Sequence, residues 1–277
     1  MAGYTQRLQS HLAEYKLARL GVEESGTFTY RGRVQPYPHI LPRQLRWLNL
    51  LEPIRREVRE YLDSHPEIQL HEYFHHLNSS QAFALNLFFP FFGQGAGNAL
   101  LQALRQPGEF NGWEPEHVAD PVEGTNVDIL WQTSDGAKTY CEIKLSEQEF
   151  GTARDDSRHR RKLDEIYRPV LQGLVADEWL TPGEFFPRYQ LFRNVWLAAR
   201  DERSSVLFLL PRANTGLWSQ LPLFLNLLAS PMAQRVKVMA IEDVLDNLAA
   251  SPNLSPRLAG YLPLLREKYL LPATTAP

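Results

Sequence analysis

Asp128, Glu142 and Lys144 have the residue types and the spacing needed for metal-assisted hydrolysis of a phosphodiester bond. Mg²⁺ prefers hard oxygen ligands and is typically held by one or two carboxylates, with water completing its octahedron. We expect Asp128 and Glu142 to supply such oxygens, with the backbone carbonyl of Ile143 as a third ligand and Mn²⁺ as a substitute metal. The bound ion would lower the pKa of a water molecule and neutralise charge on the phosphate. Lys144 would orient or help deprotonate that water, or stabilise the pentavalent phosphate.

These residues fall on two segments that are predicted to form a β-hairpin. Residues 126–132 and 138–145 are rich in apolar and β-branched side chains, and an Asp-Gly pair between them is a strong turn signal. Side chains alternate along a strand, so Glu142 and Lys144 share one face and the intervening apolar residues share the other. Burying charges is costly unless they are paired or bind a metal. The pattern therefore favours a functional site over an ordinary core strand.

Asp128 followed by Glu142-Ile143-Lys144 resembles the signature of the PD-(D/E)xK nuclease superfamily, an Asp near one strand end and a Glu-x-Lys on the next strand. Val127 stands where that family usually has Pro. The flanking sequence from about 70 to 210 resembles a bacterial restriction-endonuclease-like branch. Three segments carry this likeness: residues 78–86, 123–126 and 189–194. The resemblance implies an α/β fold with an αβββαβ core, a central mixed sheet flanked by helices, a Mg²⁺ site and DNA as the substrate.

Polar residues on a predicted helix over 187–200 are further candidates for the site. Gln190, Arg193 and Asn194 lie three and four positions apart, so they share one helix face. The resemblance implies that Gln190 supplies a polar group to the phosphate or the water and acts with the catalytic residues. Arg193 and Asn194 are expected to be auxiliary. The alternative is an ordinary amphipathic helix.

Asn86 and Glu123 are two other auxiliary candidates. Asn86 lies within an aromatic run, where a buried amide needs hydrogen-bond partners. It could approach the metal site at a position where relatives often carry Glu, or it could make a structural hydrogen bond. Glu123 precedes Asp128 by five residues and could supply a further carboxylate, or it could be a surface turn residue.

The densest basic run is the candidate for nucleic-acid binding. The net charge of −3 lacks the overall basicity of a DNA-coating protein, so a DNA contact needs a local patch. Arg158, Arg160, Arg161 and Lys162 form such a patch and are expected to bind DNA phosphates. The alternative is a solvated helix face that is paired with neighbouring acidic residues.

The length of 277 residues with 44% hydrophobic residues suits a substantial core. We expect one nuclease-like domain over 1–271, with its core at about 78–211, an N-terminal helical region at about 1–77, and a disordered tail at 272–277. Residues 146–186 are expected to form an insertion. Hydrophobic periodicity predicts the other elements. Helices are expected at 4–20, 43–63, about 79–104 with an interruption near Pro90 and the glycines of 93–97, 187–200, 217–229 and 241–249. Strands are expected at 115–119, 205–210 and 235–240, and an irregular segment at 27–42.

The single cysteine, Cys141, cannot form an internal disulfide, which indicates a reducing cytoplasm. The N-terminus lacks the apolar stretch of a signal peptide. The most apolar segment, 82–92, is too short to span a bilayer. We therefore expect a cytoplasmic protein that makes no membrane contact.

These patterns predict a Mg²⁺-dependent DNA endonuclease of restriction or defence type. One alternative is a catalytically inert DNA-binding or protein-interaction module on the same fold. Another is a repair or mobile-element nuclease with the same chemistry. The patterns leave open whether the site is active, which DNA is cut, whether one or two metals bind, and the oligomeric state, for which a homodimer is one option.

Overall fold

The computed structural model of the chain describes residues 3–120 and 123–272. All but the first residue of the tail that was expected to be disordered lies outside these ranges. The described chain divides into two compact units: unit 1 is Met1–Pro107 with Glu242–Pro277, and unit 2 is Gly108–Ile241. We treat each unit by itself, and the single domain expected for 1–271 stays a prediction.

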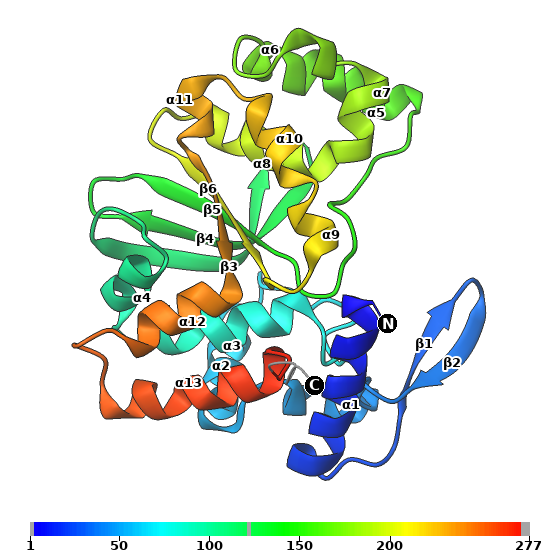
Figure 1. Cartoon of the computed structure of the whole chain (residues 1–277), viewed down its shortest axis with the longest axis vertical. Coiled ribbons are helices and arrows are strands. Elements are labelled where there is room, and N and C mark those ends of the chain that lie inside the picture. The colour runs from blue at the N-terminus through cyan, green and yellow to red at the C-terminus, as the bar shows by residue number, and fades with distance from the viewer. Residues whose placement is uncertain (1–2, 121–122, 273–277) are drawn as a thin grey trace, which may run out of the picture. The chain divides into compact units, whose positions relative to one another are not determined.

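Unit 2 is built on a five-stranded mixed sheet with the order β3-β4-β5-β6-β7 (Figure 1). Its strands are β3 (Phe110–Asp120), β4 (Thr125–Thr133), β5 (Lys138–Ile143), β6 (Ser205–Leu210) and β7 (Val236–Ala240). The first three strands pair antiparallel and the last three pair parallel. The turn between β4 and β5 needs the expected glycine, because Gly136 has a φ of +83°. The predicted hairpin is confirmed, and the weak strand expected at 115–119 is part of the longer β3.

Short helices connect the strands of unit 2. They are α5 (Ser157–Lys162), α6 (Arg168–Leu171), α7 (Pro182–Phe185), α8 (Tyr189–Ala199), α9 (Thr215–Trp218), α10 (Leu221–Asn226) and α11 (Ser230–Ala233), with a π-helical turn η2 (Leu163–Tyr167) and 3₁₀ turns η3 (Asp177–Trp179) and η4 (Phe186–Arg188). Helix α8 contacts β5 and β6. Alternate residues of β6, such as Phe208, join Phe192 and Val195 of α8 in one buried apolar cluster.

Unit 1 is mainly helical. It contains α1 (Tyr4–Leu20), strands β1 (Gly26–Tyr30) and β2 (Arg33–Tyr37), the 3₁₀ helix η1 (Arg43–Asn49), α2 (Glu52–Ser64), α3 (Ser80–Phe92), α4 (Gly97–Ala103) and α13 (Pro256–Tyr269), while α12 (Ile241–Ala249) starts at the unit boundary. Ser79 caps α3, since its side chain accepts a hydrogen bond from the amide of Ala82. None of the helices in the described part of the chain combines the length and the apolar character that crossing a bilayer requires.

Helix α3, strands β3 to β5, helix α8 and strand β6 follow one another along the chain in the expected αβββαβ order, and the α/β class with a mixed sheet is confirmed. Three local expectations are wrong. The helix expected over 217–229 is divided into α9 and α10, with residues 219–220 between them. The segment 27–42, expected to be irregular, contains the antiparallel hairpin of β1 and β2. The helix expected over 43–63 is broken between Asn49 and Glu52. Pro53 explains the break, because its ring would clash with the carbonyl of Asn49 in a continuous helix.

Candidate active site

Asp128 and Glu142 lie together on one face of the sheet in unit 2. Ile129 of β4 pairs with Cys141 of β5, so the next position in this antiparallel register sets Asp128 opposite Glu142. Side chains that are directly opposite share a face. The backbone amide of Ile143 donates a hydrogen bond of 2.7 Å to Oδ2 of Asp128. The Glu142 side chain is buried, with 4% of the residue exposed.

Lys144 completes the group on this face. Its Nζ lies 2.9 Å from Oε1 of Glu142, and both side chains are largely buried. Burial by itself would lower the pKa of the Lys144 amine, but the carboxylates of Glu142, Glu147 and Asp128 raise it by more, so its pKa lies above the ordinary value. The Lys144 amine is therefore a cation at neutral pH. In this state it can stabilise negative charge but cannot accept a proton.

The carboxyl group of Asp128 lies in surroundings that oppose its ionisation. Burial is the main cause of its raised pKa, followed by the negative charges of Glu142 and Glu116. The charge of Lys144 and the hydrogen bond from the Ile143 amide lower the pKa of Asp128, but by less than the other causes raise it. A cation bound beside Asp128 would act in the opposite direction and favour the ionised carboxylate.

Glu116 was not predicted as a site residue. Because β3 pairs Pro115 with Ile129, the next position in this register sets Glu116 opposite Asp128. Glu116 has a φ of 52°, which departs from regular strand geometry, and its negative charge acts on the Asp128 carboxyl. The signal in the sequence is only an acidic residue within a weak strand, and its place near Asp128 depends on the pairing of strands.

Helix α8 places two amides on Glu142. Nε2 of Gln190 donates a hydrogen bond of 2.6 Å to Oε1, and Nδ2 of Asn194 donates one of 3.3 Å to Oε2. Gln190 is fixed in turn by the amide of Gly151, which donates to its Oε1 at 3.0 Å. Oδ1 of Asn194 is buried and has no hydrogen-bond partner among the described residues. The structure therefore brings both predicted amides to the predicted carboxylate.

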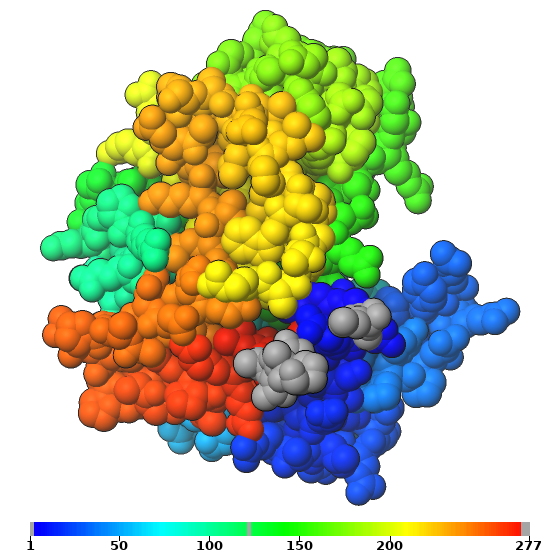
Figure 2. All heavy atoms as spheres, viewed as in Figure 1, coloured from blue at the N-terminus to red at the C-terminus, as the bar shows by residue number. Residues whose placement is uncertain are grey.

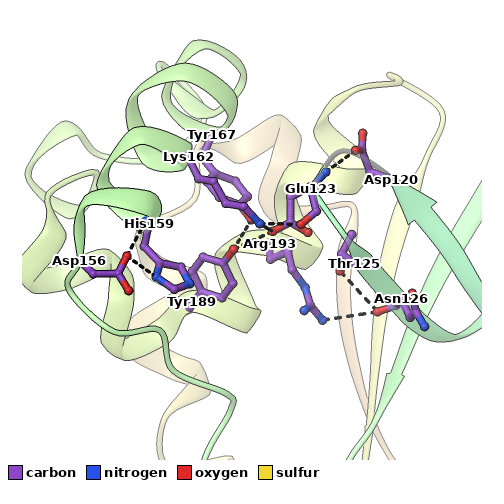
Figure 3. Close-up of polar contacts among 10 residues, drawn as sticks. All are labelled: Asp120, Glu123, Thr125, Asn126, Asp156, His159, Lys162, Tyr167, Tyr189 and Arg193. Carbon is purple, nitrogen blue, oxygen red and sulfur yellow. Dashed lines mark hydrogen bonds and ion pairs between the residues drawn. The ribbon is translucent and has the colours of Figure 1, made fainter.

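Glu123 is the centre of a second buried polar cluster (Figure 3). Its Oε1 accepts hydrogen bonds from the hydroxyls of Tyr167 at 2.5 Å and Tyr189 at 2.6 Å, and from Nζ of Lys162 at 3.0 Å. Burial and then the bond to Glu123 raise the pKa of both tyrosines, so their hydroxyls keep their protons and donate. Glu123 is 4% exposed and is not a surface turn residue.

Arg193 projects from α8 towards this second cluster. Figure 3 shows its side chain between Glu123 and Asn126, and its Nη2 donates to the carbonyl oxygen of Asn126 at 3.5 Å. Its Nε is buried without a hydrogen-bond partner in the described part of the chain. Arg193 therefore differs from Gln190 and Asn194, which reach Glu142 from the same helix.

Asn86 makes its hydrogen bonds within unit 1. Its Oδ1 accepts from the amide of Leu51 at 2.8 Å. Its Nδ2 donates to the carbonyl of Asn49 at 3.0 Å and to the hydroxyl of Tyr269 at 2.7 Å. These three bonds agree with the structural alternative for this residue.

The four residues of the basic run differ in their surroundings. Arg160 contacts Asp155 at 2.5 Å, and Arg161 lies 3.9 Å from the glutamate one turn later. Lys162 faces inward, into the cluster of Figure 3. Arg158 makes no ion pair with any described residue. The expected binding of DNA phosphates by all four residues stays a prediction, and it would require these ion pairs to open.

The donor set at Asp128 and Glu142 fits a hard divalent cation. In the part of the chain that the structure covers, no three His, Cys, Asp or Glu side chains form a group able to hold a metal. Two facing carboxylates with water as the remaining ligands are a usual arrangement for Mg²⁺. The unsatisfied Oδ1 of Asn194 could accept a hydrogen bond from such a water. Of the predicted ligand Ile143, the structure shows the amide at Asp128 but no role of the carbonyl.

Comparison with known proteins places these features in a family. The family model described as restriction endonuclease associating with ARP matches residues 9–270. No curated protein and no solved structure matches the chain. The match includes Asp128, Glu142, Lys144 and the whole sheet. The chain therefore belongs to the family of restriction endonucleases associating with ARP.

Proposed function

We propose that the protein is a Mg²⁺-dependent DNA endonuclease of restriction or related defence type, with a site of the PD-(D/E)xK kind. One observation carries the proposal: Asp128 and Glu142 face each other across two strands, and the Lys144 ammonium lies 2.9 Å from Glu142. Membership of a restriction-endonuclease family supports DNA as the substrate. The buried charges have no evident structural purpose, since apolar residues would stabilise the sheet as well or better.

Each residue of the candidate site has a separate role in this proposal. When bound, Mg²⁺ would activate a water molecule and offset charge on the phosphate. Asp128 and Glu142 would hold the ion with their carboxylate oxygens. Gln190 and Asn194 fix the orientation of the Glu142 carboxylate through their two hydrogen bonds. Lys144, held as a cation, would stabilise the additional negative charge of the phosphate as the nucleophile attacks.

The test is cleavage of supercoiled and linear duplex DNA by the purified protein. We expect cleavage with Mg²⁺ or Mn²⁺ and none with a chelator. Glu142→Gln should lower the cleavage rate by at least about 10²-fold, because it removes a carboxylate ligand of the ion that would activate the water and offset charge on the phosphate. Glu149→Gln removes the same charge from an exposed nearby position and should leave the rate unchanged. A parent protein that binds DNA but never cuts it with any divalent ion would contradict the proposal and favour the inert DNA-binding module.

A further inference from the structure

The hairpin of β1 and β2 in unit 1 is almost wholly exposed. Of its ten strand residues only Gly26 is buried. Tyr30 and Val34, two large apolar residues near the tip, are 52% and 67% exposed. In Figures 1 and 2 the hairpin projects from the rest of unit 1 as a separate arm. An exposed hairpin with unpaired edges is a liability unless the protein uses it.

The base of this arm is fixed to unit 1. The amide of Gly26 donates to the carbonyl of Ile40 at 2.8 Å. A Cβ at Gly26 would lie 2.2 Å from the carbonyl oxygen of Leu41, so no larger residue fits there. The ring of Phe28 packs edge-on against Tyr73, with the centroids 5.2 Å apart. Because a two-stranded hairpin alone is marginally stable, these contacts are what hold the arm in one direction.

The tip of the arm presents two arginines. Arg31 and Gly32 have φ values of 49° and 77°, which is the pattern of a type I′ turn. Asn or Asp is favoured at the first of these positions, and another residue there costs about 1 kcal/mol. The Arg31 guanidinium lies 5.2 Å from the centroid of the Tyr30 ring. Neither Arg31 nor Arg33 makes an ion pair with a described residue, so both cations are available to a partner.

The segment that contains the hairpin is positively charged, whereas the whole chain is negatively charged. Residues 25–51 contain four arginines and no acidic residue, whereas the chain has a net charge of −3. The four are Arg31, Arg33, Arg43 and Arg46. Phe28, Tyr30, Tyr37 and Trp47 lie in the same segment. A cationic arm with exposed aromatic and apolar side chains complements a polyanion that also offers apolar surface.

We infer that the hairpin of β1 and β2 is a DNA-binding arm that lies in the major groove of duplex DNA. The major groove is about 12 Å wide and admits a two-stranded ribbon. Arg31 and Arg33 would contact phosphates that border the groove, while Tyr30 and Val34 would contact the groove wall. The choice of DNA rests on the proposed function, but the arm belongs to unit 1 and uses none of the residues assigned to cleavage.

The test measures binding separately from cleavage. Affinity for a short DNA duplex is measured by fluorescence anisotropy over a range of salt concentrations, in the Glu142→Gln background so that the duplex stays intact. Adding Arg31→Ala and Arg33→Ala should raise Kd at least about tenfold and reduce the salt slope by about 2, since each phosphate contact contributes about 0.9. Replacing both arginines by Lys should keep most of the salt slope. That result would show that the loss of affinity in the alanine variant comes from the loss of positive charge.

The matched control removes two exposed arginines of unit 1 that already have acidic partners. Arg56 lies 3.7 Å from Glu60, and Arg257 lies 3.0 Å from Glu57. Changing both to Ala should leave Kd and the salt slope close to the parent values. Thermal unfolding of each variant checks that the fold is kept.

The outcomes separate this inference from the proposed function. If the parent cuts DNA and the Arg31→Ala, Arg33→Ala variant binds it with the parent's Kd and salt slope, the arm is not a DNA contact and the inference fails alone. The inference also fails if the variant loses self-association instead, because the hairpin edge would then be an interface between copies. If the parent never cuts DNA but binds it through the arm, the inference stands and the proposed function fails.

Discussion

The side-chain amide of Gln190 donates a hydrogen bond of 2.6 Å to the buried carboxylate of Glu142. Tyr189, the preceding residue, donates a bond of equal length to Glu123. Two consecutive residues at the start of α8 thus reach two different buried carboxylates. The first bond joins α8 to the candidate metal ligand on β5, and the second fixes the end of the helix from which Gln190 extends.

Tyr189→Phe is therefore expected to reduce cleavage, whereas Tyr167→Phe is not. Both hydroxyls donate to the same oxygen of Glu123, but only Tyr189 adjoins Gln190. Loss of the Tyr189 bond should misplace Gln190 and slow the reaction by about tenfold or more, because small displacements at a reacting group are costly. Single-turnover cleavage rates at saturating DNA check this. Equal rates for the two variants would mean that the Glu123 cluster only stabilises the fold.

Asp128→Asn is expected to abolish cleavage and to stabilise the protein when divalent ions are removed. The pKa of Asp128 is raised in the folded chain by burial and then by neighbouring carboxylates. Its ionisation therefore weakens the folded state as pH rises above the pKa of the unfolded chain, and Asn removes that loss. In the presence of a chelator, thermal unfolding should show the variant to be more stable than the parent at about pH 7, with little difference between them at about pH 4. Added Mg²⁺ should stabilise the parent but not the variant.

The fold of unit 1 is expected to weaken in mild acid because of His39. Burial and then the charge of Lys16 lower the pKa of His39 from 6.5 to about 4. Between these two values the unfolded chain binds a proton that the folded chain does not, so stability falls as pH drops from about 6.5 to about 4. The difference corresponds to roughly 3 kcal/mol. Denaturant unfolding across this range checks it. His39→Gln should make the fall in stability shallower, and His76, whose pKa burial lowers to about 3, accounts for a further part of it.

Asn86→Ala is expected to cost stability but not catalysis. The change leaves the buried amide of Leu51 without its acceptor and removes one of the two donors to the carbonyl of Asn49, which should lower the free energy of unfolding by about 3 kcal/mol. Gln102→Ala, at an exposed position of α4, is the control and should change stability by less than about 0.5 kcal/mol. Cleavage at saturating DNA should match the parent for both variants. A large loss of cleavage in a folded Asn86→Ala protein would revive an auxiliary role for this amide.

Local patterns predicted the parts of the candidate site that depend on strand and helix periodicity. The alternation of side chains in β5 placed Glu142 and Lys144 on one face, and they lie 2.9 Å apart. The spacing of Gln190 and Asn194 placed both on one face of α8, and both reach the same carboxylate. The shared face of each pair holds within one stretch of fixed periodicity, so the sequence alone predicts it. The packing of α8 against β5, which brings the two amides to Glu142, is a tertiary contact that periodicity does not predict.

Features that depend on distant contacts escaped prediction. Glu116 comes near Asp128 only through the register of β3 against β4, which no local pattern specifies. Lys162 faces inward because a buried carboxylate attracts it, although its basic neighbours indicated an exposed patch. The turn at Arg31 was missed because an arginine replaces the residues that usually mark a type I′ turn.

The division of unit 1 into two segments has a consequence for synthesis on the ribosome. The sheet of unit 2 is complete once residue 241 has emerged, whereas unit 1 still lacks α13. Lys268 and Tyr269 of α13 are the hydrogen-bond partners of Asn49 and Asn86. Until the last helix is translated, Asn49 and Asn86 lack these two partners, so the first hundred residues must wait for the end of the chain to reach their final packing. The sheet that bears the candidate active site is therefore complete before unit 1, which bears the arm.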